Sequence, residues 1–209
     1  MNVSIALAIV ASYLLGAIPT SFWVVRAVKG VDLRTLGSGN LGATNLYRVM
    51  GWKYAIPVGV FDTLKGAIPV WIFAPMTGLG ELAAALLGVT AVLGHVFSVF
   101  VGFKGGKGVA TGGGVILGLA PWAFLVSLVL WAVVVRFTGY VSLGSVASAL
   151  SLPAAILVLH PERSIELVAV VAVLALLVVW LHRANIRRLL SGTENRFGRR
   201  AAPDGEAPR

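Results

Sequence analysis

Residues 109–135 read VATGGGVILGLAPWAFLVSLVLWAVVV, and the layout of the whole chain depends on how many helices this stretch forms. It is an apolar run of 27 residues, longer than the roughly 20 residues that one membrane-spanning helix needs. Three glycines, Gly112 to Gly114, lie near its start, and Pro121 lies near its middle. The run predicts either one tilted helix or a short helix followed by a second one, the two meeting near Ala120-Pro121.

The composition is that of an integral membrane protein. Of the 209 residues, 58% are apolar and only 12% are charged, and the mean hydropathy is +0.91. Soluble domains carry about 25% charged residues. We expect a single all-α membrane domain over residues 1–197, followed at 198–209 by an Arg/Pro/Ala-rich disordered tail in the cytoplasm.

The charged and reactive residues narrow the possible functions. The chain has no cysteine, which excludes disulfides, thiolate metal sites and a cysteine nucleophile. Its net charge of +9 can indicate nucleic-acid binding, but the basic residues lie between and after the apolar runs, so membrane orientation explains them better. No pair of the three histidines has metal-ligand spacing, so we expect neither a metal nor a cofactor.

The distribution of Lys and Arg decides between six and seven helices. Besides 109–135, runs long enough to span a membrane occur at about 3–25, 54–75, 81–101, 140–159 and 165–181. If 109–135 forms two helices, 15 of the 17 Lys and Arg residues fall on one side of the membrane; if it forms one, they divide eight against eight. Positive residues concentrate on the cytoplasmic side. We therefore expect seven transmembrane helices, one of them short or broken, with the N-terminus outside and the C-terminus cytoplasmic.

The first polar stretch is GSGNLGATNLYR, from Gly37 to Arg48. It begins with the G-x-G-x-x-G fingerprint of dinucleotide-binding folds, but that fold needs flanking strands and here membrane helices flank the motif. We therefore reject a dinucleotide site. The glycines still allow backbone N–H groups to converge on an anion, and Arg48 supplies a guanidinium suited to phosphate. The alternative is a flexible loop.

The second polar stretch, GHVFSVFVGFKGGKGVATGGG, runs from Gly94 to Gly114. It fails the phosphate-binding P-loop pattern because Gly108, and not Ser or Thr, follows Lys107. Two lysines on a glycine-rich backbone that enters a helix nevertheless describe an anion cradle. The alternative is that Lys104 and Lys107 only flank a membrane span and orient it.

The third polar stretch, HRANIRRLLSGTENR, begins at His182. If the preceding helix continues, His182, Asn185 and Leu189 share one of its faces, at positions i, i+3 and i+7. A histidine at a membrane edge is common, so a functional and a structural role for His182 both stay open. Arg187 and Arg188 are expected to face lipid head groups.

Two ionisable residues lie inside the apolar run 54–75. Asp62 and Lys65 are three positions apart, so they can pair on one helix face. Such groups cost several kcal/mol at membrane depth and face the bundle interior or a water-filled cavity. A structural ion pair and a functional site are both compatible with this pattern. His95 is a weaker case of the same kind.

Four segments together resemble the signature segments of the bacterial membrane glycerol-3-phosphate acyltransferases PlsY. They are GSGNLGATNLYR, FDTLKG, GHVFSVFVGFKGGKGVAT and HRANIRRLLSGTENR, in this order. The resemblance extends from the first helix to about Phe197. The chain has no G-x-S-x-G nucleophile elbow. It also lacks the H-x-x-x-x-D signature of CoA-dependent glycerolipid acyltransferases.

The resemblance implies a seven-helix enzyme of the bacterial inner membrane with its active site at the cytoplasmic face. Such an enzyme transfers a fatty acyl group from acyl phosphate to the 1-hydroxyl of sn-glycerol 3-phosphate. The products are lysophosphatidic acid and inorganic phosphate, in the first step of phospholipid synthesis. Because acyl phosphate is already activated, the protein mainly has to position the hydroxyl and stabilise developing charge. The substrates and membrane lipid are the implied partners, and nucleic acid is not.

The motifs and the resemblance together predict the site residues. Arg48, Lys104 and Lys107 are expected to neutralise phosphate, helped by backbone amides. His182 is the only side chain expected to act as a general base, unless a substrate phosphate oxygen takes the proton. The predicted catalytic residues are Ser38, His182 and Asn185. The predicted substrate and phosphate ligands are Gly39, Asn40, Thr44, Asn45, Arg48, Lys65, Lys104, Gly105, Gly106, Lys107 and Ser142. The predicted supporting residues are Asp62, His95 and Glu194.

A transporter of an organic phosphate or another anion is the alternative. It too would use broken helices, intramembrane charges and helix N-termini. Two features count against it: no inverted repeat is visible, and the polar motifs gather on one face of the membrane and not at its midplane.

Overall fold

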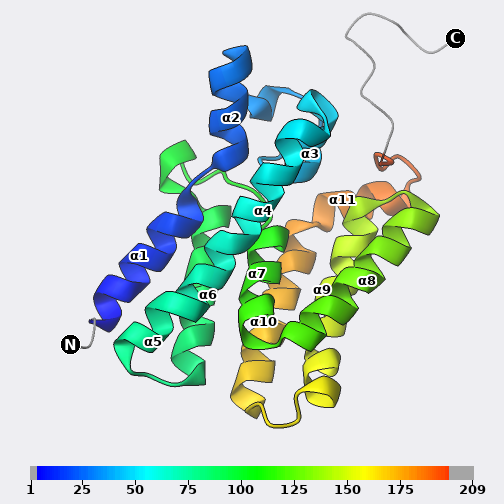
Figure 1. Cartoon of the computed structure of the whole chain (residues 1–209). Helices are drawn as coiled ribbons and strands as arrows, with labels where there is room; N and C mark the ends of the chain where they lie inside the picture. Colours follow the sequence, from blue (N-terminus) through cyan, green and yellow to red (C-terminus); the bar gives the residue numbers. More distant parts are fainter. Residues whose placement is uncertain (1–3, 198–209) are drawn as a thin grey trace, which may run out of the picture.

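The computed structural model describes residues 4–197, which form a bundle of helices without a strand (Figure 1). The predicted tail at 198–209 lies outside the described residues. The α-helices are α1 (Ile5–Ala17), α2 (Thr20–Lys29), α3 (Ala43–Met50), α4 (Trp52–Ile68), α5 (Ala74–Thr77), α6 (Glu81–Val96), α7 (Val109–Leu119), α8 (Pro121–Thr138), α9 (Val141–Leu159), α10 (Ile165–Leu181) and α11 (Arg183–Leu190). Three short elements join them: the 3-10 helices η1 (Leu33–Thr35) and η3 (Val99–Val101), and the π-helix η2 (Pro69–Phe73).

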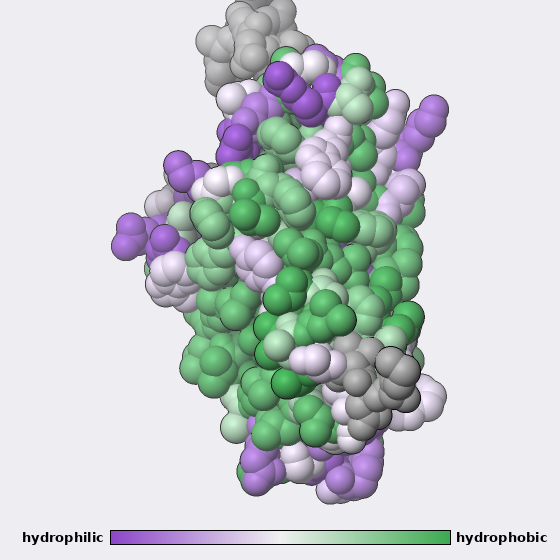
Figure 2. Space-filling model, turned by 90° about the vertical axis from the view of Figure 1, so that its left-hand side faces the viewer, coloured by the Kyte–Doolittle hydropathy of each residue, from purple (hydrophilic) through white to green (hydrophobic). Residues whose placement is uncertain are grey.

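Several helical stretches are long and apolar enough to cross a membrane. Five stand alone: Ile5–Lys29, Trp52–Thr77, Glu81–Val101, Pro121–Thr138 and Val141–Leu159. A sixth results if α10 and α11 count as one span bent by 57°. Figure 2 shows hydrophobic residues over the middle of one face and hydrophilic residues mainly toward its ends. The prediction of an all-α, multi-pass membrane protein is confirmed.

The stretch 109–135 forms two helices. Helix α7 ends at Leu119 and α8 begins at Pro121, with Ala120 between them at φ −147°. Proline suits the first position of a helix, where its missing N–H has no intrahelical partner. At about 1.5 Å per residue, the 11 residues of α7 measure roughly 16 Å, about half the thickness of a bilayer's hydrocarbon core. The predicted break is therefore present, and α7 is the short helix.

Close approaches at glycine hold two pairs of helices together. A Cβ atom on Gly16 of α1 would lie 2.0 Å from the carbonyl oxygen of Ala91 in α6. A Cβ atom on Gly66 of α4 would lie 1.9 Å from the carbonyl oxygen of Thr111 in α7. Only glycine permits such contacts, and small residues are the usual means of close helix packing in membranes. The contact at Gly66 places α7 beside α4, in the middle of the bundle (Figure 1).

The predicted ion pair lies inside the bundle. Lys65 Nζ lies 2.8 Å from Asp62 Oδ1, and their side chains are 1% and 3% exposed. Lys65 Nζ also donates to the carbonyl oxygen of Ile18, at 2.9 Å. This carbonyl lies at the break between α1 and α2, where Pro19 interrupts the first span. The pair therefore ties α4 to the break.

Candidate active site

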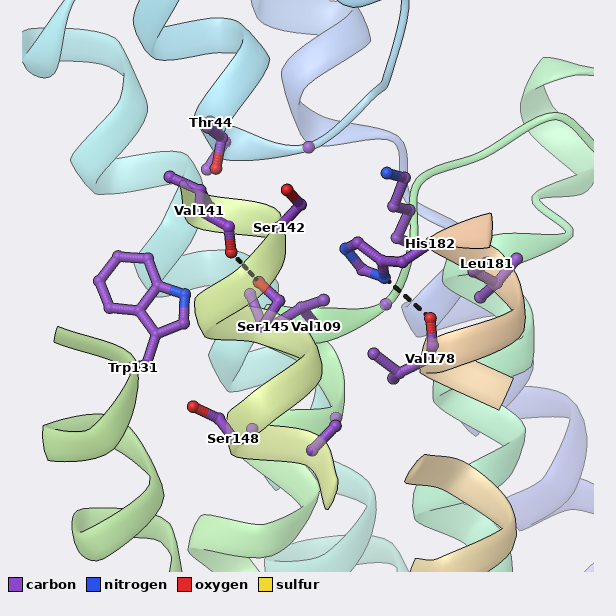
Figure 3. A pocket seen from close by; sticks show the side chains of 18 of the residues that line it. Thr44, Val109, Trp131, Val141, Ser142, Ser145, Ser148, Val178, Leu181 and His182 are labelled. Atoms are coloured by element: carbon purple, nitrogen blue, oxygen red, sulfur yellow. Dashed lines mark hydrogen bonds between the residues drawn. The ribbon is translucent and has the colours of Figure 1, made fainter. Parts of the chain in front are cut away.

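A cavity of about 560 Å³ lies between α4 and α7 on one side and α8, α9 and α10 on the other. Its upper end in Figure 1, near α3 and α11, is polar and is lined by Ser38, Asn40, Thr44, Asn45, Arg48, Lys107, Ser142, His182, Asn185, Arg188 and Glu194. Deeper in the bundle it is mainly apolar and is lined by Val109, Ile116, Phe124, Leu128, Trp131, Leu152, Val171, Leu174, Ala175 and Val178. Figure 3 shows side chains that line it. The volume is typical of ligand sites, and the two-part lining suits a molecule with a charged head and an apolar chain.

Asn45 organises the loop that carries GSGNLGATN. Its Oδ1 accepts a hydrogen bond from the N–H of Ser38, at 2.8 Å. Its Nδ2 donates to the carbonyl oxygens of Leu36 and Asn40, both at 3.0 Å. Asn45 is 1% exposed, and its amide is fully used within the loop. Its side chain therefore holds the backbone of Ser38, and its predicted role as a substrate ligand stays a prediction.

Cations surround the polar end of the cavity. Lys107 Nζ donates to Oδ1 of Asn185. Burial lowers the pKa of Lys107 to about 8; the charge of Glu194 opposes this shift, and those of Arg188 and Arg48 add to it. Burial also lowers the pKa of Arg48, whose buried Nε has no hydrogen-bond partner among residues 4–197. Because these cations are desolvated and repel one another, a bound anion would stabilise them.

Glu194 joins the segment after α11 to the cavity wall. Its Oε1 accepts from Asn185 Nδ2 at 2.6 Å and from Ser142 Oγ at 2.7 Å. Its Oε2 accepts from Arg188 Nε at 2.7 Å. Burial acts to raise the pKa of Glu194, but these three donors outweigh it and lower the pKa. Glu194 is thus an ionised hub that holds three cavity residues in place.

His182 lies just beyond the end of α10, where the chain bends by 57° into α11. The predicted continuous helix is therefore broken at this residue. His182 Nδ1 lies 2.8 Å from the carbonyl oxygen of Val178, so Nδ1 carries the hydrogen and Nε2 is an acceptor (Figure 3). Burial, followed by the charge of Lys107, lowers the pKa of His182 to about 4. The imidazole is therefore neutral at pH 7.

A sequence model of the family described as glycerol-3-phosphate acyltransferase matches residues 6–192. The chain belongs to this family. The glycerol-3-phosphate acyltransferase of Geobacter metallireducens is 51% identical over 186 residues, which cover 89% of this chain and 94% of that protein. That of Fusobacterium nucleatum is 47% identical over 189 residues, which cover 90% of this chain and 96% of that protein.

Two crystal structures of PlsY (YgiH), an integral membrane glycerol 3-phosphate acyltransferase, have the same fold. The glycerol 3-phosphate form matches with a TM-score of 0.86 at 40% identity, and the lysophosphatidic acid form with 0.85 at 38%. Each match covers 94% of this chain and 96% of the other. The resemblance seen in the sequence is confirmed. The chain is therefore a multi-pass membrane member of the glycerol-3-phosphate acyltransferase family.

Only part of the anion cradle predicted at Lys104 to Lys107 lies at the cavity. Lys104 is exposed and does not line it. Gly105 N–H donates to the carbonyl oxygen of Val96 at 2.9 Å, and Gly106 N–H donates to that of His95 at 3.1 Å. These two amides close the end of α6 and are not free to bind an anion. Among the lysines of this stretch, only Lys107 reaches the site.

Of the predicted site residues within the membrane helices, too, only some line the cavity. Asp62 and His95 line the cavity, but Lys65 does not. The Lys65 side chain is 1% exposed, and its ammonium is held by Asp62 and the Ile18 carbonyl oxygen. The structure therefore places Lys65 outside the lining of the cavity, where it was predicted to be a substrate ligand. Gly39 also lies outside the lining. Its φ of 70° shapes the turn that presents Ser38, because glycine adopts this conformation without strain.

Sequence reasoning missed two features of the site. Arg188, expected to face lipid head groups, lines the cavity and pairs with Glu194. Its spacing of three residues from Asn185 was a signal, since both lie on one face of α11. An aromatic cluster of Tyr47, Trp52 and Phe197 also lines the cavity, with ring centroids 4.9 Å apart for Tyr47 and Phe197. Among residues 4–197, no three His, Asp or Glu side chains are arranged to hold a metal ion.

Proposed function

We propose that this enzyme takes its acyl group from acyl phosphate and transfers it to the 1-hydroxyl of sn-glycerol 3-phosphate. One observation carries this proposal: a single cavity joins a desolvated cationic end to an apolar channel. Both substrates carry a phosphate, which Arg48, Lys107 and Arg188 can neutralise. The acyl chain would extend into the apolar part of the cavity between α7, α8, α9 and α10.

The transfer needs no covalent enzyme intermediate. The glycerol 3-phosphate hydroxyl oxygen attacks the acyl carbonyl carbon and forms the new ester bond. The bond between that carbon and the phosphate oxygen breaks, and phosphate leaves with the electron pair. Negative charge develops on the carbonyl and phosphate oxygens, where Lys107 and Arg48 would stabilise it. Ser38, in the loop between η1 and α3, would donate a hydrogen bond to the reacting groups.

His182 would orient the attacking hydroxyl. Its Nε2 is an acceptor, fixed by the bond from Nδ1 to the Val178 carbonyl oxygen. With a pKa lowered to about 4, it is a weak base at neutral pH. We therefore propose that His182 positions the hydroxyl and that an oxygen of the departing phosphate takes the proton. Asn185, held by Glu194 and Lys107, would complete this wall of the site.

We further propose that residues 1–197 form one domain that crosses a bacterial inner membrane seven times. In this arrangement α7 completes one crossing, the N-terminus is outside, and the active site faces the cytoplasm. Two observations support it. The start of α1 and helix α11 lie at opposite ends of the bundle (Figure 1). With seven crossings, 15 of the 17 Lys and Arg residues lie on the side of the cationic site.

The test is a donor comparison with purified enzyme in detergent or nanodiscs. Glycerol 3-phosphate is supplied with hexadecanoyl phosphate in one reaction and with hexadecanoyl-CoA in another. The proposal expects lysophosphatidic acid and an equal amount of inorganic phosphate from the first reaction only. Product from acyl-CoA alone would contradict the proposed donor. Failure of both donors, together with uptake of glycerol 3-phosphate into vesicles that contain the protein, would favour the transporter alternative.

A further inference from the structure

Gly112 lies inside helix α7, where its own backbone gives no reason for a glycine. Its N–H donates to the carbonyl oxygen of Gly108 at 2.7 Å, and its φ is not positive. Glycine destabilises a helix interior relative to alanine because it loses more conformational freedom on folding. A glycine at such a position therefore needs a reason from its surroundings.

Neighbouring helices supply that reason for other glycines of the bundle. A Cβ atom on Gly114 would lie 1.8 Å from the carbonyl oxygen of Thr63. A Cβ atom on Gly113 would lie 3.4 Å from the ring of Phe124. A Cβ atom on Gly112 would meet no atom within 4 Å, and it is the only glycine inside the helices of residues 4–197 of which this is true. No contact within the protein therefore requires glycine at 112.

The space beside Gly112 belongs to the cavity, because Gly112 is one of the residues that line it. Val109 and Ile116, at i−3 and i+4, lie on the same face of α7 and also line the cavity. Along this face the lining changes from Lys107 and Gly108 to the apolar residues of the channel. Gly112 lies about one helical turn, roughly 5.4 Å, beyond Gly108. Bare backbone is thus exposed where the polar and apolar parts of the cavity meet.

We propose that Gly112 is a binding residue for the acyl chain. The first methylene groups beyond the acyl carbonyl lie against its backbone, and the missing side chain sets the width of the channel at that point. This inference rests on the proposed function, in which the acyl chain occupies the apolar part of the cavity. It assigns the width of the channel near the carbonyl end of the acyl chain to one position on α7.

Two substitutions test the inference, with one matched control. Gly112→Ala adds a methyl group, and Gly112→Leu fills the space. The control is Gly59→Ala in α4, because a Cβ atom there meets only Ala43, at 3.6 Å, and Gly59 does not line the cavity. Each purified variant is assayed for kcat/KM with octanoyl and hexadecanoyl phosphate at saturating glycerol 3-phosphate, and for the KM of glycerol 3-phosphate. Thermal unfolding is followed in parallel.

We expect Gly112→Leu to lower kcat/KM for both donors by about 10-fold to 100-fold, as steric overpacking does. The KM for glycerol 3-phosphate should change by less than about 3-fold, a difference well below one factor of ten in binding. Gly112→Ala should have a smaller effect of the same kind, and Gly59→Ala none. Neither Ala variant should unfold at a lower temperature, since alanine favours the helix.

Two results would overturn the inference: wild-type kinetics of Gly112→Leu with both donors, or a rise in the KM for glycerol 3-phosphate with donor kinetics unchanged. A failure of the proposed donor would look different. If the wild-type enzyme uses hexadecanoyl-CoA and not acyl phosphate, the donor is wrong. The same comparison of variants with acyl-CoA donors then still decides the role of Gly112, because the acyl chain is common to both.

Discussion

Asn185 is held from both sides: its Nδ2 donates to Oε1 of Glu194 at 2.6 Å, and its Oδ1 accepts a hydrogen bond from Lys107. These residues come from three separate parts of the chain: the loop before α7, helix α11, and the segment that follows α11. Contacts within the chain therefore hold the polar end of the cavity together. Preorganised donors of this kind stabilise developing charge without having to reorient during the reaction.

Glu194→Gln should lower activity without changing the fold. The amide keeps the size of the carboxylate, but it has one acceptor oxygen and no charge, so Arg188 loses its charged partner. We expect kcat/KM to fall by at least about 10-fold, the cost of removing a charge-assisted hydrogen bond. Initial rates of lysophosphatidic acid formation measure it. Glu162→Gln is the control, since that side chain is 63% exposed and lies outside the cavity. Equal activity of the two variants would contradict the role of Glu194 as a hub.

Lys107 should give the enzyme an alkaline limit. With a pKa near 8, its ammonium is charged below that pH and neutral above it, so phosphate binding weakens as pH rises through about 8. The logarithm of kcat/KM for glycerol 3-phosphate, plotted from pH 6 to 10, should therefore decline above 8. Lys107→Arg should remove this decline, because the pKa of arginine exceeds about 12. Lys104→Arg, at an exposed position, should leave the profile unchanged. A decline that persists in Lys107→Arg would assign it to another group.

Ser38→Ala should nearly abolish acyl transfer while the fold stays intact. The Ser38 side chain makes no hydrogen bond to the residues that the structure describes, and Asn45 holds only its backbone N–H. Loss of the hydroxyl should therefore cost little stability. It should lower kcat by about 100-fold or more, as the loss of one transition-state donor does. Lysophosphatidic acid formation and thermal unfolding are measured together. A stable and fully active variant would show that this loop is only a turn.

His182→Ala should lower kcat much more than it raises KM. The imidazole is fixed by its bond to the Val178 carbonyl oxygen, and in the proposed mechanism it orients the hydroxyl in the transition state. Steady-state kinetics with both substrates varied separate the two constants. A rise in KM with kcat unchanged would make His182 a binding residue only. In the wild-type enzyme, kcat should show no titration of His182 between pH 6 and 8, because its pKa is about 4.

Lys65→Met should destabilise the bundle. It removes one partner of a buried ion pair and leaves the Asp62 carboxylate uncompensated, a change that typically costs about 3–5 kcal/mol. Unfolding of the purified protein in detergent measures the loss. Adding Asp62→Asn should recover part of the stability, since the unpaired charge is then gone. A Lys65→Met variant as stable as the wild type would contradict a structural role for the pair.

The sequence indicated which segments carry polar side chains, and the structure shows which of these side chains line the cavity. Arg48, Lys107 and His182 do, and their catalytic and binding roles stay predictions. The amides of Gly105 and Gly106 bond to carbonyl oxygens at the end of α6, and no local pattern shows which carbonyl lies opposite an N–H. Arg188 pairs with Glu194 across the turn that ends α11, where Gly192 has a φ of 71°, and this contact was not predicted from the sequence.

The sequence by itself determined that the chain is a bundle of membrane helices, where 109–135 breaks, and to which family the protein belongs. Hydrophobic run length, proline position and motif order are local properties, so they can be read without coordinates. Only the tertiary structure decided which polar groups remain available to substrate. Lys65 donates to the carbonyl oxygen of Ile18, 47 residues away, and Gly112 lies beside open space in a cavity between helices. These properties depend on how segments far apart in the chain pack against one another, and no local pattern records that.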